Sequence, residues 1–187
     1  GRGCLIAAIC LLSASAEADV TLEQSSARAD TTYKAVLRVP HGCDGAATTA
    51  VRVSIPEGLI AVKPMPKAGW TLTTRRGPYA KDYAYFGKPM SEGVVEITWS
   101  GGQLADDHFD EFVFQGRLVA ELTPGTVLPV PVTQECTSGR AAWTEVAAAG
   151  TDSHKLKHPA PLLRIVPGET AQKRSEEHTS ELQSRQY

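Results

Sequence analysis

The sequence predicts an all-β fold, a sandwich or barrel of about eight or nine short strands. Apolar and polar residues alternate with a period of two in many segments, which is typical of strands with one buried face. Glycine- and proline-containing turns separate these segments, and no long stretch shows the 3.6-residue period of an amphipathic helix. A chain of 187 residues is long enough for one domain with a proper core.

The strand assignments follow the alternation in chain order. Residues 77–90 are rich in aromatic side chains and predict a long hairpin or a lid. Pro129 and Pro131 cannot donate to a ladder, so the strand that contains them is expected at a sheet edge or a bulge. The predicted strands are 33–39, 49–55, 95–99, 111–118, 127–133, 142–146 and 162–166.

Residues 1–18 predict a signal peptide. Arg2 precedes a short apolar run at 4–12, and Ala16-Glu17-Ala18 forms a small-x-small cleavage site. The apolar run is far shorter than the roughly 20 residues of a membrane span. We expect cleavage after Ala18, an upstream start because residue 1 is not Met, and a periplasmic or secreted mature protein that begins at Asp19.

The expected domain covers residues 19–167 and is followed by a polar stub at 168–173. Residues 174–187 resemble the in-frame translation of a sequencing adapter, and we expect them to be disordered and without function. The net charge of −2 and the lack of any basic run argue against a nucleic-acid binder.

Two of the four cysteines lie in the leader, which leaves Cys43 and Cys136 in the mature chain. In an exported protein such a pair predicts a disulfide. Closing a loop of about 90 residues is worth on the order of 4–5 kcal/mol in the chain-entropy model. A two-cysteine metal site is the alternative, and the absence of Cys or His neighbours at ligand spacing disfavours it.

The sequence contains no nucleophile elbow, phosphate loop, zinc-protease signature or dinucleotide fingerprint, so we predict that the protein is not an enzyme. The carboxylates at 106–111 could act as a hydrolase acid and base. We interpret them instead as a polar turn whose Asp and His groups satisfy loop amides. His154 and His158 lie among lysines and a proline, which predicts a solvated loop.

His41 precedes Cys43 by two residues. A disulfide would therefore hold His41 close to the residues around Cys136, which include Trp143 seven positions later. Trp143 either packs into the core or forms the wall of a cation site.

These segments resemble the YcnI-like family of exported copper-binding domains. The resemblance follows the predicted leader and spans nearly the whole mature domain. It implies an immunoglobulin/cupredoxin-like β-sandwich of about 8–9 strands with one disulfide. The matching pieces are 20–23 (VTLE), 36–45 (VLRVPHGCDG), 53–58 (VSIPEG), 66–70 (PKAGW), 97–102 (ITWSGG), 109–114 (FDEFVF), 134–136 (QEC) and 143–145 (WTE).

The resemblance also implies a Cu(II) site at the N-terminus that cleavage exposes. In the family, the amine and imidazole of a first-residue His bind the ion together with a carboxylate, and a Trp lies close by. Amine and imidazole nitrogens suit Cu(II). In this chain Asp19 replaces that His, and the family's carboxylate position falls on Gly42. The implied site is therefore Asp19, His41 and Asp44, with Trp143 beside them.

The resulting hypothesis is a Cu(II)-binding protein for copper trafficking or buffering, whose partner is a periplasmic copper chaperone or a membrane copper transporter. One alternative is a metal-free adhesion or carbohydrate-binding sandwich with an aromatic platform. A second is a copper-dependent oxidase or oxygenase, which the missing first-residue His and the lack of a second obvious imidazole ligand disfavour. The platform of the first alternative consists of Tyr79, Tyr83, Tyr85 and Phe86.

Overall fold

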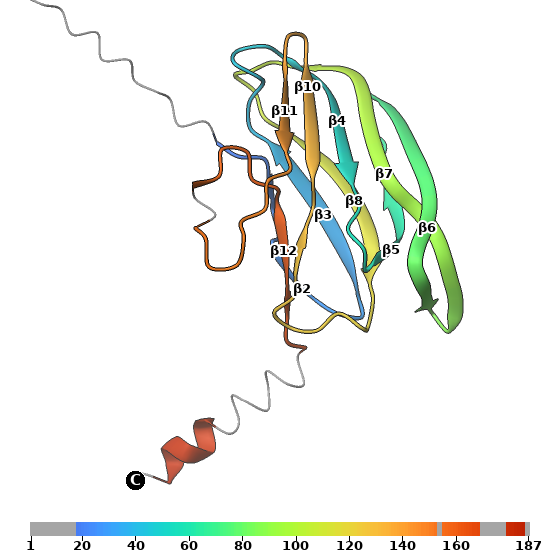
Figure 1. Ribbon diagram of the computed structural model, residues 1–187, viewed down its shortest axis with the longest axis vertical. Helices are drawn as coiled ribbons and strands as arrows, with labels where there is room; N and C mark the ends of the chain where they lie inside the picture. The colour runs from blue at the N-terminus through green and yellow to red at the C-terminus, as the bar shows by residue number, and fades with distance from the viewer. Residues whose placement is uncertain (1–17, 153–154, 169–178, 186–187) are drawn as a thin grey trace, which may run out of the picture.

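The computed structural model describes residues 18–152, 155–168 and 179–185. In these parts the chain forms a β-sandwich (Figure 1): a sheet in the order β1-β3-β8-β5 packs on a sheet in the order β11-β10-β4-β7-β6, and a smaller sheet, β2-β12-β9, lies along one side. The strands are β1 Thr21–Leu22, β2 Ser26–Arg28, β3 Thr31–Val39, β4 Thr48–Ser54, β5 Leu59–Pro64, β6 Thr71–Tyr85, β7 Lys88–Leu104, β8 Asp110–Leu118, β9 Val127–Pro129, β10 Val132–Cys136, β11 Arg140–Trp143 and β12 Leu162–Val166.

The predicted all-β sandwich is confirmed, with differences in detail. The described part of the chain has twelve strands instead of eight or nine, because β1, β2 and β5 lie outside the predicted ranges and one predicted strand forms two. The strand predicted at 127–133 is divided after Pro129, and its first half forms the edge of the small sheet. The strand predicted at 142–146 lies instead at Arg140–Trp143.

The core lies between the sheets. Strands β3 and β8 pair in one register from Thr31↔Leu118 to Val39↔Asp110, which turns their alternate apolar residues to the same face. Phe112 from β8 meets the Trp99 ring from β7 with ring centroids 5.5 Å apart, and the Trp99 indole N–H donates to the Met65 carbonyl at 3.1 Å. A buried ring of this size is worth about 4–6 kcal/mol in transfer free energy before entropy costs.

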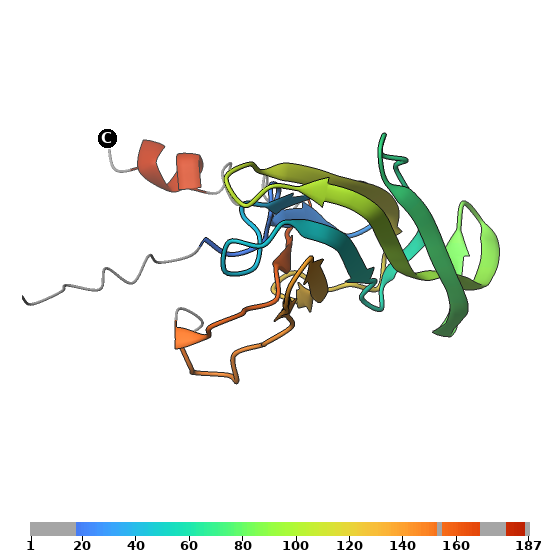
Figure 2. The same cartoon turned by 90° about the horizontal axis from the view of Figure 1, so that it is seen from above.

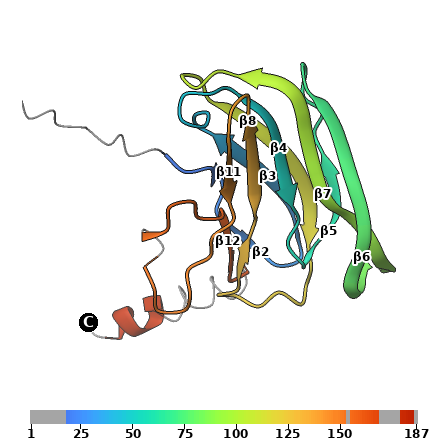
Figure 3. The same cartoon turned by 45° about the horizontal axis from the view of Figure 1, so that its top comes forward.

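Strands β6 and β7 form the long hairpin predicted at 77–90, and Figure 3 shows that it extends beyond the sandwich. Its turn contains Phe86 and Gly87, with φ of 48° and 78°. Two positive φ values in a two-residue loop match the twist of the flanking strands. Figure 2 shows this hairpin and the loop that follows β11 on opposite sides of the molecule.

Residues 1–17 of the predicted leader lie outside the described residues, and Ala18 is the first described residue. In the segment predicted to be disordered, residues 179–184 form a short helix. No helix in the described ranges has both the length and the apolar character required to cross a membrane.

Candidate functional site

The predicted disulfide is confirmed. Cys43 and Cys136 are bonded across 93 residues of sequence and join the turn after β3 to the end of β10. The sequence-based expectation that this bond holds His41 near Trp143 is also confirmed, because the two rings lie 6.2 Å apart.

Gln134 connects the Trp143 ring to the backbone of His41 through a hydrogen-bond network. Its side chain is 1% exposed, and its amide oxygen accepts from the indole N–H of Trp143 at 3.0 Å. Its amide nitrogen donates to the His41 carbonyl at 2.7 Å and to the Thr48 hydroxyl at 2.8 Å. A fully bonded amide in a low-dielectric interior fixes its partners strongly. Gln134 therefore sets the positions of Trp143 and of the backbone at His41.

The His41 ring faces a carbonyl oxygen on each side. Nδ1 lies 2.5 Å from the Gly42 oxygen, and Nε2 lies 2.7 Å from the Ala18 oxygen. A carbonyl can only accept and a neutral imidazole carries one N–H, so a neutral His41 ring can donate to one of these two oxygens at a time. The Nδ1 contact has the form of the backbone hydrogen bond that commonly orients a metal-binding His, whose other nitrogen then faces the ion. In His41 that other nitrogen faces the predicted cleavage point.

Asp19 is the residue that cleavage would place first. Its nitrogen is bonded to the carbonyl carbon of Ala18, so the atom that would become the amine lies within one peptide group of His41 Nε2. Asp19 also lines a shallow cavity of about 280 Å³ together with Pro159 and Ala160. The start of the first strand and Trp143 thus lie at the same place in the fold.

His158 is a site residue that sequence reasoning missed. It was predicted in a solvated loop, but its ring is half-buried, with its centroid 4.9 Å from that of Trp143. Glu145 closes the loop, because its N–H donates to the His158 carbonyl at 3.1 Å and its carbonyl accepts from Ala160 at 2.8 Å. No local pattern in the sequence signals this closure. His154 lies outside the described residues.

Asp44 lies apart from His41, Trp143 and His158. It is exposed, at φ 47°, in a turn closed by hydrogen bonds between Cys43 and Ala46. Within the described ranges, no hydrogen bond or ion pair joins it to His41. The nearby acidic segment behaves as predicted, because the Asp106 carboxylate accepts from the Gly42 N–H at 2.9 Å.

The donor set fits copper only when the amine is free. Among the residues that the structure describes, no three His, Cys, Asp or Glu side chains form a group that could hold a metal ion. The amine and the imidazole of His41 would supply two nitrogen donors, and His158 places a second imidazole on Trp143. Nitrogen donors of this kind suit Cu(II).

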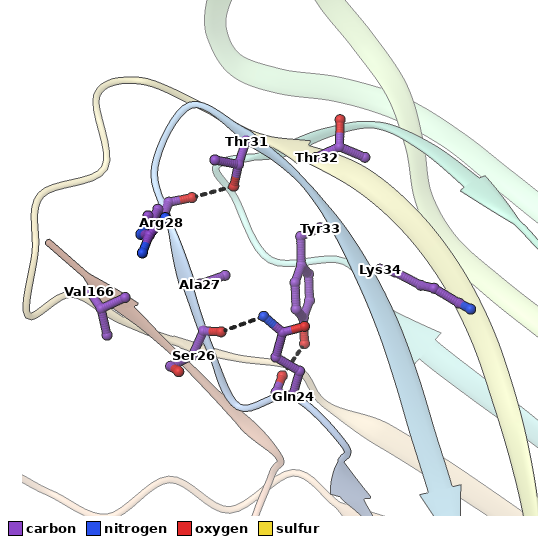
Figure 4. A pocket seen from close by; sticks show the side chains of 9 residues that line it. All are labelled: Gln24, Ser26, Ala27, Arg28, Thr31, Thr32, Tyr33, Lys34 and Val166. Atoms are coloured by element: carbon purple, nitrogen blue, oxygen red, sulfur yellow. Dashed lines mark hydrogen bonds between the residues drawn. The ribbon is translucent and has the colours of Figure 1, made fainter. Parts of the chain in front are cut away.

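A larger pocket, of about 390 Å³, lies between β2 and β3 (Figure 4). Figure 4 shows that some of its polar side chains already bond to backbone carbonyls: the hydroxyl of Tyr33 donates to the Gln24 carbonyl at 2.6 Å, and that of Thr31 donates to the Arg28 carbonyl at 2.7 Å. Burial raises the pKa of Tyr33 to about 12. These side chains satisfy carbonyls along an edge where the strands do not pair, so we interpret the pocket as a structural gap.

The aromatic residues of the hairpin are mostly packed against the protein. Tyr83 is buried, and its hydroxyl donates to the Glu57 carboxylate at 2.6 Å. Burial, followed by this hydrogen bond, raises the pKa of Tyr83 to about 12. The hydroxyl of Tyr79 accepts from the Ala61 N–H at 3.1 Å. Of the predicted platform, Phe86 is 75% exposed.

Comparisons with known proteins agree with this architecture. A crystal structure of an uncharacterized protein from Nocardia farcinica, described as revealing an immunoglobulin-like fold, is similar over 80% of this chain and 99% of that one, with 24% identity and a TM-score of 0.57. No curated protein matches. A family model described as a domain of unknown function (DUF1775) matches residues 19–165. The chain therefore belongs to the DUF1775 family.

Proposed function

We propose that this protein binds Cu(II) outside the cytoplasm and acts in copper trafficking or buffering, with the ion held at the N-terminus that leader removal exposes. The observation that carries the proposal is the 2.7 Å contact between His41 Nε2 and the Ala18 carbonyl. Cleavage after Ala18 would remove this oxygen and convert the Asp19 nitrogen, which lies in the same peptide group, into a primary amine near the imidazole nitrogen.

The other groups around the proposed ion come from residues beside the amine and His41. The Asp19 carboxylate belongs to the residue that bears the amine, and Trp143 forms the wall beside His41. This set resembles the YcnI-like arrangement, except that its imidazole comes from His41 instead of the first residue. We propose a binding role without catalysis, and a copper chaperone or membrane copper transporter as the partner.

The test is a Cu(II) titration of protein whose first residue is Asp19, followed by electron paramagnetic resonance. We expect one ion per chain and hyperfine coupling to at least two nitrogens. The matched control retains Ala18 and therefore has a peptide nitrogen at residue 19. It should lose affinity by at least about 100-fold, the upper end of what loss of an outer-shell partner costs.

His41→Ala should cause a comparable loss, while Asp44→Asn should leave the affinity unchanged. Asp19→His should strengthen binding, because it adds an imidazole to the residue that carries the amine. Equal Cu(II) affinity of the protein with and without Ala18 would overturn the proposal.

A further inference from the structure

We propose that reduction of the Cys43–Cys136 disulfide creates a second metal site, which binds one Cu(I) ion between the two sulfurs. The two Cα atoms lie 6.0 Å apart, and both residues are only half-buried. A small dithiol can therefore reach the bond. The site requires neither the N-terminal amine nor His41, so it is independent of the function proposed above.

The two cysteine segments are held together by hydrogen bonds that do not involve sulfur. The turn after β3 is closed by Cys43 N–H to the Ala46 carbonyl at 3.0 Å and by Ala46 N–H to the Cys43 carbonyl at 2.9 Å. The Thr137 N–H, one residue beyond Cys136, donates to the Ala47 carbonyl at 2.9 Å. This last bond joins the two segments directly. After reduction the thiols remain side by side and cannot drift apart without breaking it.

The chemistry of the pair selects the ion. Thiolates are soft ligands that favour Cu(I), zinc and iron–sulfur clusters. Structural zinc almost always takes four ligands. In the described ranges no group of three His, Cys, Asp or Glu side chains could hold a metal ion, so the pair is not part of a four-ligand zinc site. The Thr48 hydroxyl lies 4.0 Å from Cys136 Sγ, but a neutral hydroxyl is a hard, weak ligand. Two sulfurs alone suit Cu(I), a closed-shell monovalent ion that two thiolates can bind in linear two-coordinate geometry.

Each step balances. A dithiol reductant transfers two electrons and two protons to the sulfur–sulfur bond and closes to its own disulfide, which leaves Cys43 and Cys136 as thiols. As Cu(I) binds, each thiol releases its proton to solvent and each sulfur donates an electron pair to the ion. The copper does not change its oxidation state.

The experiment is an anaerobic Cu(I) titration of the processed protein in competition with the chelator bathocuproine disulfonate, before and after reduction and removal of the reductant. We expect one tightly bound Cu(I) per reduced chain and none at this site in the oxidised chain, which serves as a folded control. In the reduced state, Cys43→Ser and Cys136→Ser should each weaken binding by at least about 100-fold, or ~2.8 kcal/mol.

Two further measurements keep the outcome clear. His41→Ala and the protein that retains Ala18 should bind Cu(I) as the reduced wild type does, which separates this site from the proposed Cu(II) site. Circular dichroism of the reduced chain should retain the β-sheet spectrum. Equal Cu(I) uptake by the reduced chain and by the Cys43→Ser variant would overturn the proposal, as would loss of the fold on reduction.

Discussion

Trp143 and Tyr83 are both buried aromatic side chains with one polar atom, but the structure holds them in different ways. The indole N–H of Trp143 donates to Gln134, which also bonds the backbone of His41, and the disulfide closes the same end of the sandwich. The hydroxyl of Tyr83, on the long hairpin, donates to the Glu57 carboxylate. The same Glu57 oxygen also accepts from the Ala80 N–H at 2.9 Å. The first network is centred on Gln134, which is buried, whereas the second is centred on Glu57, which is exposed.

The difference between the two regions predicts how the energetic effects of substitutions combine. Members of one buried hydrogen-bond network are energetically coupled, whereas distant residues without shared partners contribute additively. We therefore expect the Trp143 region to respond as a unit, and changes at the hairpin to add to changes at Trp143. The following predictions run from the largest expected effect to the smallest.

Trp143→Ala should lower the free energy of unfolding by about 3–5 kcal/mol, because it leaves a large cavity in the core. Guanidinium denaturation measures this. Trp143→Phe, which keeps a ring but leaves the Gln134 amide oxygen without its donor, should cost about 1–3 kcal/mol. A cost below about 1 kcal/mol for Trp143→Ala would contradict the description of this ring as part of the core.

Gln134→Leu should cost on the order of 3 kcal/mol, because it strands the Trp143 indole N–H and the His41 carbonyl in the interior. Combined with Trp143→Phe, it should show a coupling energy of about 0.5–3 kcal/mol; combined with Tyr83→Phe, the two effects should add within about 0.5 kcal/mol. Denaturation of the single and double variants gives both values. Additivity in the first pair would remove the distinction between the two regions.

Stability should fall as the pH rises from about 10 towards 12. Tyr33 and Tyr83 have a pKa of about 12 in the folded protein, so the folded state keeps protons that the unfolded state has lost, and ionisation favours unfolding. The loss should be at most about 2 kcal/mol per tyrosine by pH 12, because solvent screens part of the effect. Tyr83→Phe should flatten the pH dependence of the melting temperature. Trp143→Phe should not change it, because an indole does not ionise in this range.

Phe86→Asn at the hairpin tip should change stability by no more than about 0.5 kcal/mol. The change relieves the positive φ of 48° in a bulky residue but loses the contact of the Phe86 ring with Arg117, 5.1 Å from ring centroid to Cζ. Thermal unfolding measures the net effect. A loss above 1 kcal/mol would show that the tip packs more tightly than its exposure indicates.

The parts of this structure that sequence reasoning predicted are those with local signals. Alternation identifies β3 and β8, because one buried face imposes a period of two on each strand. The disulfide follows from the cysteine count and the predicted leader. Neither inference requires knowledge of which strands are neighbours.

The rest depends on register and loop closure. Strands β10 and β11 pair with Val132 opposite Trp143. Gln134 is two residues after Val132, so its side chain lies on the same face as that of Trp143 and the two can bond. His158 reaches the same ring because the loop after β11 closes at Glu145. A single sequence does not indicate either pairing, so the roles of Gln134 and His158 were not predicted.

The close approach at Gly42 limits how this region can be redesigned. A β-carbon on residue 42 would fall on the carbonyl oxygen of Ala46, and backbone cannot move aside as a flexible side chain can. Introducing a carboxylate ligand here by a single substitution is therefore impossible without breaking the Cys43–Ala46 turn. An engineer who wants a stronger chelate must exchange the whole turn as a cassette, or build from the amino end of the processed chain.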